Sequence, residues 1–169
     1  MDRASASAAP APVAGARRKR TRSLLSRAIA LLARRDHSRA ELAQKLARYV
    51  GEGDDPAEIA RVIEKLDGNQ LLSDERFAVA VARNRSLRFG DARIRHDLRR
   101  FGVAPEISAN AVASVSGSEA ARAHHVWSKR FAALPTSPAE RSKQARFLQA
   151  RGFSLDSILQ VLRGRVERD

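Results

Sequence analysis

Arginine is concentrated between residues 83 and 103, where seven arginines stand against two acidic residues, Asp91 and Asp97. A guanidinium group forms paired hydrogen bonds with a phosphate or a carboxylate, so this stretch has the side chains to bind an acidic partner. A solvated helix surface would also accept arginine. We favour a contact face, because acids barely offset the positive charge and the helix needs none of the arginines. The seven are Arg83, Arg85, Arg88, Arg93, Arg95, Arg99 and Arg100.

One short helix is expected to position most of these arginines. Asp91 is placed to cap its start, and Gly102 follows it, where a left-handed residue would end it. Ile94, Leu98 and Phe101 recur at helical spacing and fall within one narrow arc. Arginines flank that arc and fill the far side, so one face should be buried and nearly all the rest cationic. The candidate contact residues are Arg85, Arg88, Phe89, Arg93, Arg95, Arg99 and Arg100, together with Arg146 and Arg151 from the last third of the chain.

The positive charge extends beyond this helix. The formal net charge is +13 over 169 residues, and residues 1–22 supply only five of it. A field of this sign favours nucleic acid, an acidic protein surface or an anionic membrane as partner. The chain has no cysteine, which excludes disulfides and cysteine-based zinc sites. No apolar run approaches the ~20 residues that span a membrane, and residues 1–22 lack the apolar core of a secretory signal. We expect a cytoplasmic protein with a disordered basic tail over residues 1–22.

The residues do not predict a catalytic centre. His124 and His125 are adjacent, so on a helix their side chains point about 100° apart and cannot share a metal ion as a pair. The acids at 54, 55, 58, 74 and 75 lie where helices start, and helix capping explains them. No glycine-rich phosphate loop and no nucleophile elbow occurs. We therefore expect neither enzymatic activity nor a cofactor.

The rest of the chain predicts helices throughout. Periodic apolar residues separated by Ser, Pro and Gly recur from residue 24 onward, without the alternation of strands. Ser38 and Glu41 form a capping box before one helix. Several apolar residues near helix ends are expected in the core with the others: Tyr49, Leu87, Phe131 and Leu155.

The helices fall into three copies of one unit. Leu46, Leu98 and Leu148 occupy the same place about fifty residues apart. Each unit is too small to bury its own core, so neighbouring units should stack into a curved, elongated rod. A single globular bundle is the alternative. The expected segments are a tail over 1–22 and three-helix repeats over 23–68, 69–116 and 117–169.

The aromatic residues have two interpretations. They could stack on nucleobases, or they could pack the core, and their helical spacing favours packing. Phe89 is the exception, because it lies between Arg88 and Gly90 in a connecting segment.

Two segments resemble the RecX family of regulatory proteins. One runs from Leu71-Leu72-Ser73-Asp74-Glu75-Arg76-Phe77-Ala78 through Arg85, Arg88-Phe89-Gly90, Ile94 and Leu98 to Gly102-Val103. The other includes Arg146-Phe147-Leu148, Arg151-Gly152-Phe153-Ser154 and Ile158. The likeness covers about residues 23–165, with a poorly matching first repeat. Unit three has Arg151 where unit two has the aromatic Phe101, and the basic tail is extra.

The resemblance implies a fold and a partner. Members of the family have three tandem three-helix repeats, bind the RecA recombinase in the groove of its filament on single-stranded DNA, and suppress strand exchange, ATP hydrolysis and co-protease activity in DNA repair and the SOS response. The protein would act as a monomer, with sequence-independent DNA binding supplied by its charge. The alternative is a helix-turn-helix or nonspecific DNA-binding protein that acts on DNA directly.

Overall fold

The structure is a computed structural model that describes residues 23–51, 55 and 57–166. The predicted tail over residues 1–22 lies outside the described residues. Every regular element in the described part is a helix, and none of these helices is long and apolar enough to cross a membrane. The helices are α1 Leu24–Leu32, α2 Arg39–Ala47, α3 Ala57–Gly68, α4 Asp74–Ser86, α5 Asp91–Arg100, α6 Pro105–Ala113, α7 Glu119–Ser128, α8 Pro138–Gln149 and α9 Leu155–Leu162.

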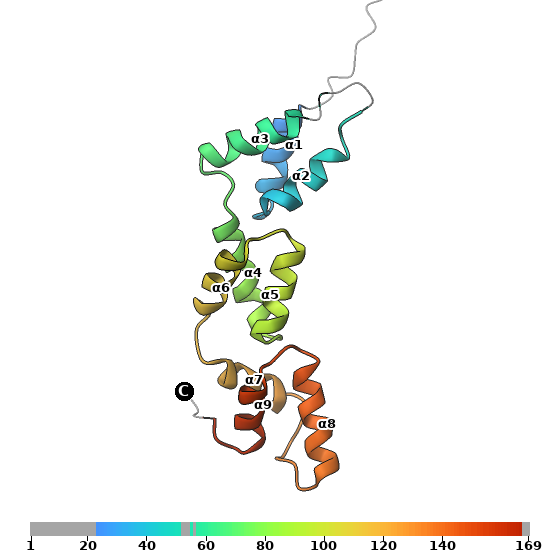
Figure 1. Cartoon of the computed structure of the whole chain (residues 1–169), viewed down its shortest axis with the longest axis vertical. Coiled ribbons are helices and arrows are strands. Elements are labelled where there is room, and N and C mark those ends of the chain that lie inside the picture. Colours follow the sequence, from blue (N-terminus) through green and yellow to red (C-terminus); the bar gives the residue numbers. More distant parts are fainter. Residues whose placement is uncertain (1–22, 52–54, 56, 167–169) are drawn as a thin grey trace, which may run out of the picture.

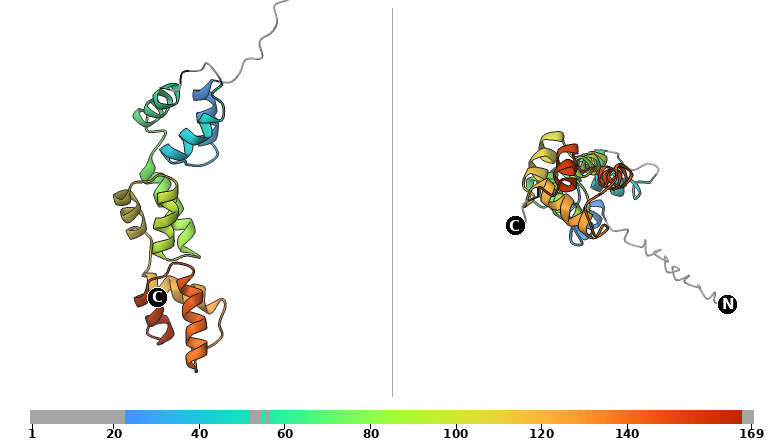
Figure 2. Two further views of the ribbon diagram at one scale, coloured as in Figure 1. Left: turned by 45° about the vertical axis from the view of Figure 1, so that its right-hand side comes forward. Right: turned by 90° about the horizontal axis from the view of Figure 1, so that it is seen from below.

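The helices form three triplets stacked end to end, as Figure 1 shows. Helices α1–α3 are repeat 1, α4–α6 are repeat 2 and α7–α9 are repeat 3. Each repeat has its own apolar cluster, which includes the fully buried Leu46 in the first, Leu98 in the second and Leu148 in the third. The stack bends gently in the second view (Figure 2). The structure thus has the predicted elongated rod and excludes the single closed bundle.

Serine side chains start most of the helices. The hydroxyls of six serines accept a hydrogen bond from the backbone N–H three residues further on, which satisfies a free amide of the first turn. These residues are Ser23, Ser38, Ser73, Ser118, Ser137 and Ser154. The prediction that Asp91 caps α5 was wrong, because Gly90 is the N-cap and Asp91 is the first helical residue.

Three residues predicted for the core are exposed instead. The exposed fraction is 51% for Tyr49, 65% for Leu87 and 70% for Leu155. Each lies at or beyond a helix end, where the chain no longer follows the helical face that points inward. Tyr49 instead lies under the Arg27 guanidinium, 4.2 Å from its ring centroid. Helix α7 also ends earlier than expected, so Phe131 packs on the core from a loop.

At each junction, a glycine turn of one repeat packs against the start of a helix in the repeat before it. The turn after α5 places Gly102, with φ of +73°, so that a Cβ atom there would lie 2.5 Å from Cβ of Ala40 in α2. The turn after α8 places Gly152, with φ of +80°, against Gly90 and Arg93 at the start of α5. Glycine is required at both turns, because other residues rarely adopt this backbone conformation and a side chain would not fit.

Candidate contact grooves at the repeat junctions

The arginine helix α5 has the buried face that the sequence predicted, with one acidic addition. Ile94 and Leu98 are fully buried, while Phe101 is half-buried in a T-shaped contact with Phe77. Asp97 is also buried, with 4% of its surface exposed, and this was not predicted. Its carboxylate lies 2.9 Å from the guanidinium of Arg85 and 3.4 Å from that of Arg93. Two of the candidate contact arginines are therefore held by an internal carboxylate.

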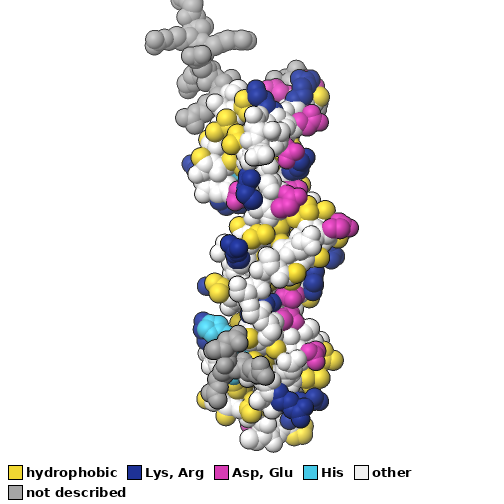
Figure 3. All heavy atoms as spheres, turned by 90° about the vertical axis from the view of Figure 1, so that its left-hand side faces the viewer, with side chains coloured by type: hydrophobic (Ala, Val, Ile, Leu, Met, Phe, Trp, Pro, Cys, Tyr) yellow, Lys and Arg dark blue, Asp and Glu magenta, His cyan; other side chains and the backbone are white. Residues whose placement is uncertain are grey.

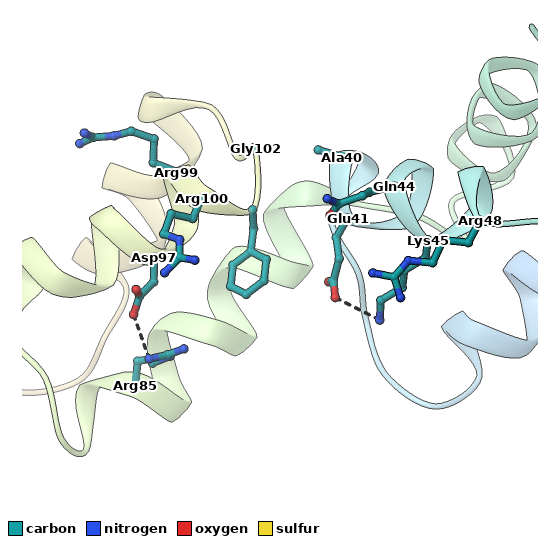
Figure 4. Close-up of a pocket in the computed structure, with 11 residues that line it drawn as sticks. Ala40, Glu41, Gln44, Lys45, Arg48, Arg85, Asp97, Arg99, Arg100 and Gly102 are labelled. Atoms are coloured by element: carbon teal, nitrogen blue, oxygen red, sulfur yellow. Dashed lines mark ion pairs between the residues drawn. The ribbon is translucent and has the colours of Figure 1, made fainter. Parts of the chain in front are cut away.

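A groove opens where repeat 1 meets repeat 2, and we call it the 1–2 groove. Its volume is about 760 Å³. Lys45 of α2 and Arg48, the C-cap of α2, lie on one side, and Arg99 and Arg100 of α5 lie on the other (Figure 4). Arg85 of α4 completes the cationic lining. The structure thus brings Arg85, Arg99 and Arg100 together.

Glu41 lies in the wall of the 1–2 groove within a cluster of basic side chains. Its carboxylate contacts Arg35 at 2.5 Å, Nδ1 of His37 at 2.9 Å and Nζ of Lys45 at 3.2 Å. Burial of the carboxyl works to raise its pKa, but hydrogen bonds from these three side chains prevail and lower the pKa of Glu41 to about 2. The predicted capping box is therefore only half formed: Ser38 accepts from the Glu41 N–H, while the Glu41 side chain turns to the cations.

A second groove opens where repeat 2 meets repeat 3, and we call it the 2–3 groove. Its volume is about 630 Å³, and its lining includes the predicted residues Arg88, Phe89 and Arg151. The guanidinium of Arg151 lies over the Phe147 ring, 3.8 Å from the centroid. No carboxylate lines this groove among the described residues. The remaining lining residues are Leu87, His125, Val126, Lys129 and Arg130.

The Phe89 ring interacts with two arginines. The guanidinium carbons of Arg85 and Arg93 lie 5.6 and 5.9 Å from the centroid of its ring, within the range of cation–π attraction. The ring is half-buried and packs against the core of repeat 2. Phe89 therefore belongs both to the core edge and to the 2–3 groove.

Three predicted residues line neither groove. Arg93 is exposed but pairs with Asp97, and Arg95 and Arg146 are exposed on α5 and α8. The face seen from the side of α3 and α6 mixes basic, acidic and apolar side chains (Figure 3). Over the described residues, this face therefore carries no continuous cationic patch.

Sequence reasoning missed cations that the fold adds to these grooves. Lys45 and Arg48 come from repeat 1, and Lys129 and Arg130 come from the end of α7. None of them lies in a local concentration of cations like that of residues 83–103, so only the position in the repeat could have indicated them. Residues 48 and 100 occupy matching places near the ends of α2 and α5, and that correspondence was the available signal.

Glu119 ties repeat 3 to repeat 2 beside the 2–3 groove. Its Oε1 accepts a hydrogen bond from the backbone N–H of Asp91 at 2.8 Å. Its Oε2 accepts from the N–H of Ser154 and from the hydroxyl of Ser157, both in repeat 3. Burial favours a higher pKa for Glu119, but these hydrogen bonds outweigh it and lower the pKa. Neither this contact nor its partners could be read from spacing, since the residues are 28 to 38 positions apart.

Metal binding has no candidate site in the part of the chain that the structure describes. No group of three or more His, Asp or Glu residues is arranged to hold a metal ion there. The acidic clusters are instead engaged with arginines, lysines and backbone amides. The grooves are suited to binding by charge.

Known proteins resemble this chain in sequence and in fold. Residues 73–112 match the second three-helix domain of RecX, and residues 118–162 match the third. The chain is 43% identical to the regulatory protein RecX of Leptothrix cholodnii over 83% of its own length and 88% of that protein, and 39% identical to that of Ralstonia nicotianae over 84% and 87%. The crystal structure of RecX from Lactobacillus salivarius superposes with a TM-score of 0.71 at 19% identity, covering 84% of this chain and 94% of that one. The chain therefore belongs to the RecX family of regulatory proteins.

Proposed function

We propose that this protein binds the RecA filament on single-stranded DNA and inhibits it, lowering strand exchange, ATP hydrolysis and co-protease activity. Membership of the RecX family supports this proposal, since its relatives are regulatory proteins. The observation that carries it is the position of the cations. They gather in two successive grooves along one rod, which suits a partner that repeats along its length.

The rod supports a mechanism based on bridging. Each groove alone offers a few charge contacts, but both grooves belong to one chain, so the second contact forms at a high effective concentration. A rod that touches neighbouring RecA protomers would hold their relative positions and so oppose the movements that accompany ATP turnover. Guanidinium groups suit both possible contacts, acidic edges of RecA and phosphates of the DNA. We propose that the protein acts as a cytoplasmic monomer without catalytic activity.

We also propose the functional units of the chain. Residues 23–68, 69–116 and 117–169 act as the three repeats, and residues 1–22 act as a separate basic segment. The apolar clusters support this division, because each consists of residues from one repeat, apart from Leu72, which packs in the cluster of repeat 1.

The test is ATP hydrolysis by RecA filaments on single-stranded DNA. The protein would be titrated at concentrations far below that of the DNA sites, with and without competitor DNA. We expect suppression at that ratio, unaffected by the competitor. Suppression only when the protein saturates the DNA would instead favour the second candidate, a DNA-binding protein that acts on DNA directly; the cationic grooves are the observation in its favour.

A further inference from the structure

The 1–2 groove holds more positive charge than its own carboxylates neutralise. Seven of its eleven lining residues are charged, five of them cationic and two acidic. Both acids are already engaged, Glu41 by cations of repeat 1 and Asp97 by arginines of repeat 2. Arg48, Arg99 and Arg100 form no ion pair within the described residues. These three guanidinium groups are available to an external anion.

The unpaired cations stand on two different repeats. Arg48 is the C-cap of α2, while Arg99 and Arg100 belong to α5 on the opposite side of the groove (Figure 4). Like charges on the two sides of a junction repel, and the repulsion acts to open it. An anion placed between them would reverse the sign of this interaction and draw the two repeats together.

The ties that oppose this repulsion are made by side chains. The Ser38 hydroxyl donates to the carbonyl of Phe101 at 2.5 Å, and the carboxylate of Asp74 accepts from the N–H of Arg39 at 2.8 Å. Arg76 and Asp36 approach only to 4.0 Å. The backbone-to-backbone hydrogen bonds between repeats 1 and 2 in the described residues are confined to the connecting turn, where the N–H groups of residues 69–71 donate to carbonyls at the end of α3. The junction is therefore free to respond to an anion in the groove.

The lining favours phosphate as the anion. Guanidinium groups bind phosphate oxygens in pairs, and the lining offers charged and polar groups with Ala40 and Phe101 as the main apolar surface. A volume of about 760 Å³ lies in the range of ligand sites. A nucleic-acid strand presents successive phosphates, so a single ligand can reach the cations of both helices.

We propose that the 1–2 groove binds the sugar–phosphate backbone of single-stranded DNA, and that the bound phosphates clamp repeat 1 against repeat 2. The RecA filament carries such a strand, so this binding site deepens the proposed function. It rests on the proposed function only for the place where the protein meets the DNA. The groove would bind the strand in the free protein too. Its test therefore contains no RecA and can fail independently of the ATPase measurement.

The first experiment measures binding of a fluorescein-labelled twelve-residue oligothymidylate by anisotropy, over a range of salt concentrations. Arg48→Gln combined with Arg100→Gln should weaken binding about tenfold or more and reduce the slope of log affinity against log salt by about two, one for each lost phosphate contact. Arg141→Gln combined with Arg163→Gln removes the same charge from exposed positions of repeat 3 and should leave both quantities within twofold.

Three results would overturn the binding site. The first is an unchanged affinity and salt slope in the Arg48 and Arg100 variant. The second is an equal loss in the repeat 3 control, which would make the effect one of net charge. The third is equal binding of a labelled oligoglutamate of the same length, which would assign the groove to an acidic protein segment.

The second experiment measures the clamp itself. The chain has no cysteine, so spin labels can be placed at Ala60→Cys and Ala109→Cys, on exposed positions of repeats 1 and 2. Saturating oligothymidylate should narrow or shift the distance distribution between them. A second pair at Ala109→Cys and Ala139→Cys spans the other junction and should not respond. An unchanged first pair, or equal changes in both, would contradict the clamp.

Discussion

The two junctions share one contact but differ in how firmly it is held. At each, a glycine turn of one repeat sits on the helix start of the repeat before it. At the 2–3 junction the N–H groups of Gly90 and Ala92 donate to carbonyls of the turn after α8, at 3.0 and 3.3 Å. At the 1–2 junction the Ser38 side chain makes the corresponding contact with Phe101. The comparison indicates a rigid junction and an adaptable one.

Matching positions near the starts of α2 and α5 also carry opposite charges. Glu41 in α2 contacts Lys45 at 3.2 Å, and in the matching places of α5 Arg93 contacts Asp97 at 3.4 Å. The residue before the helix cap is His37 in repeat 1 and Phe89 in repeat 2, and each touches the helix residue four positions later. The same backbone thus supports a carboxylate in one repeat and a cation in the other.

The largest expected effect comes from adding a Cβ atom at Gly90, where the 2–3 junction is tightly packed. In Gly90→Ala the new Cβ would lie 2.3 Å from the carbonyl oxygen of Gly152 and 2.4 Å from Cα of Phe153, and both are backbone atoms that cannot turn away. We expect a loss of about 3 kcal/mol in the free energy of unfolding, measured by urea denaturation. Gly68→Ala, where a Cβ would meet nothing within 4 Å, is the control. Equal stability of the two variants would show that the junction is not tightly packed.

Removing the carboxylate at the same junction should have the next largest effect. Glu119→Gln replaces an acceptor of three hydrogen bonds with an amide that presents N–H groups to some of the same donors. We expect a loss of about 2 kcal/mol in unfolding free energy, by thermal or urea denaturation. Glu106→Gln, also in a first helical turn but exposed on α6, controls for the helix dipole. A similar loss in both variants would contradict a specific role for Glu119.

Acid should weaken repeat 1 through Glu41. The folded pKa of about 2 lies below the ordinary value of 4.5, so the ionised carboxylate stabilises the fold above pH 4.5 and this contribution is lost as pH falls toward 2. After allowance for solvent screening the contribution is about 1–2 kcal/mol. Stability curves of wild type and Glu41→Gln should therefore converge between pH 4.5 and 2. Parallel curves over that range would contradict the assignment.

Sequence periodicity predicted the helices, the repeats and the apolar centres, because Leu46, Leu98 and Leu148 depend on spacing within a single helix. It failed at helix ends such as Tyr49 and Leu155, where the chain leaves the helical face. Contacts between distant positions were not predictable from spacing.

The candidate site was likewise predictable where it depends on local sequence and unpredictable where it depends on contacts between repeats. The arginines of α5 were visible as a local concentration, whereas Lys45 and Arg48 joined them only through the stacking of repeat 1 on repeat 2. The internal pairing of Arg85 with Asp97 was equally hidden, because a buried carboxylate among arginines looks like surface in the sequence. Local pattern predicted the cationic helix, and tertiary packing determined which of its cations are available.

The most direct test of the account is RecA ATP hydrolysis with charge-reversed grooves. Arg99→Glu with Arg100→Glu reverses the 1–2 groove, Arg88→Glu with Arg130→Glu reverses the 2–3 groove, and Arg141→Glu with Arg163→Glu is the matched control. With helicity confirmed by circular dichroism, we expect each groove variant to lose at least tenfold in inhibitory potency while the control stays within twofold of wild type. Full inhibition by both groove variants would show that the junction grooves are not the surface that contacts the filament.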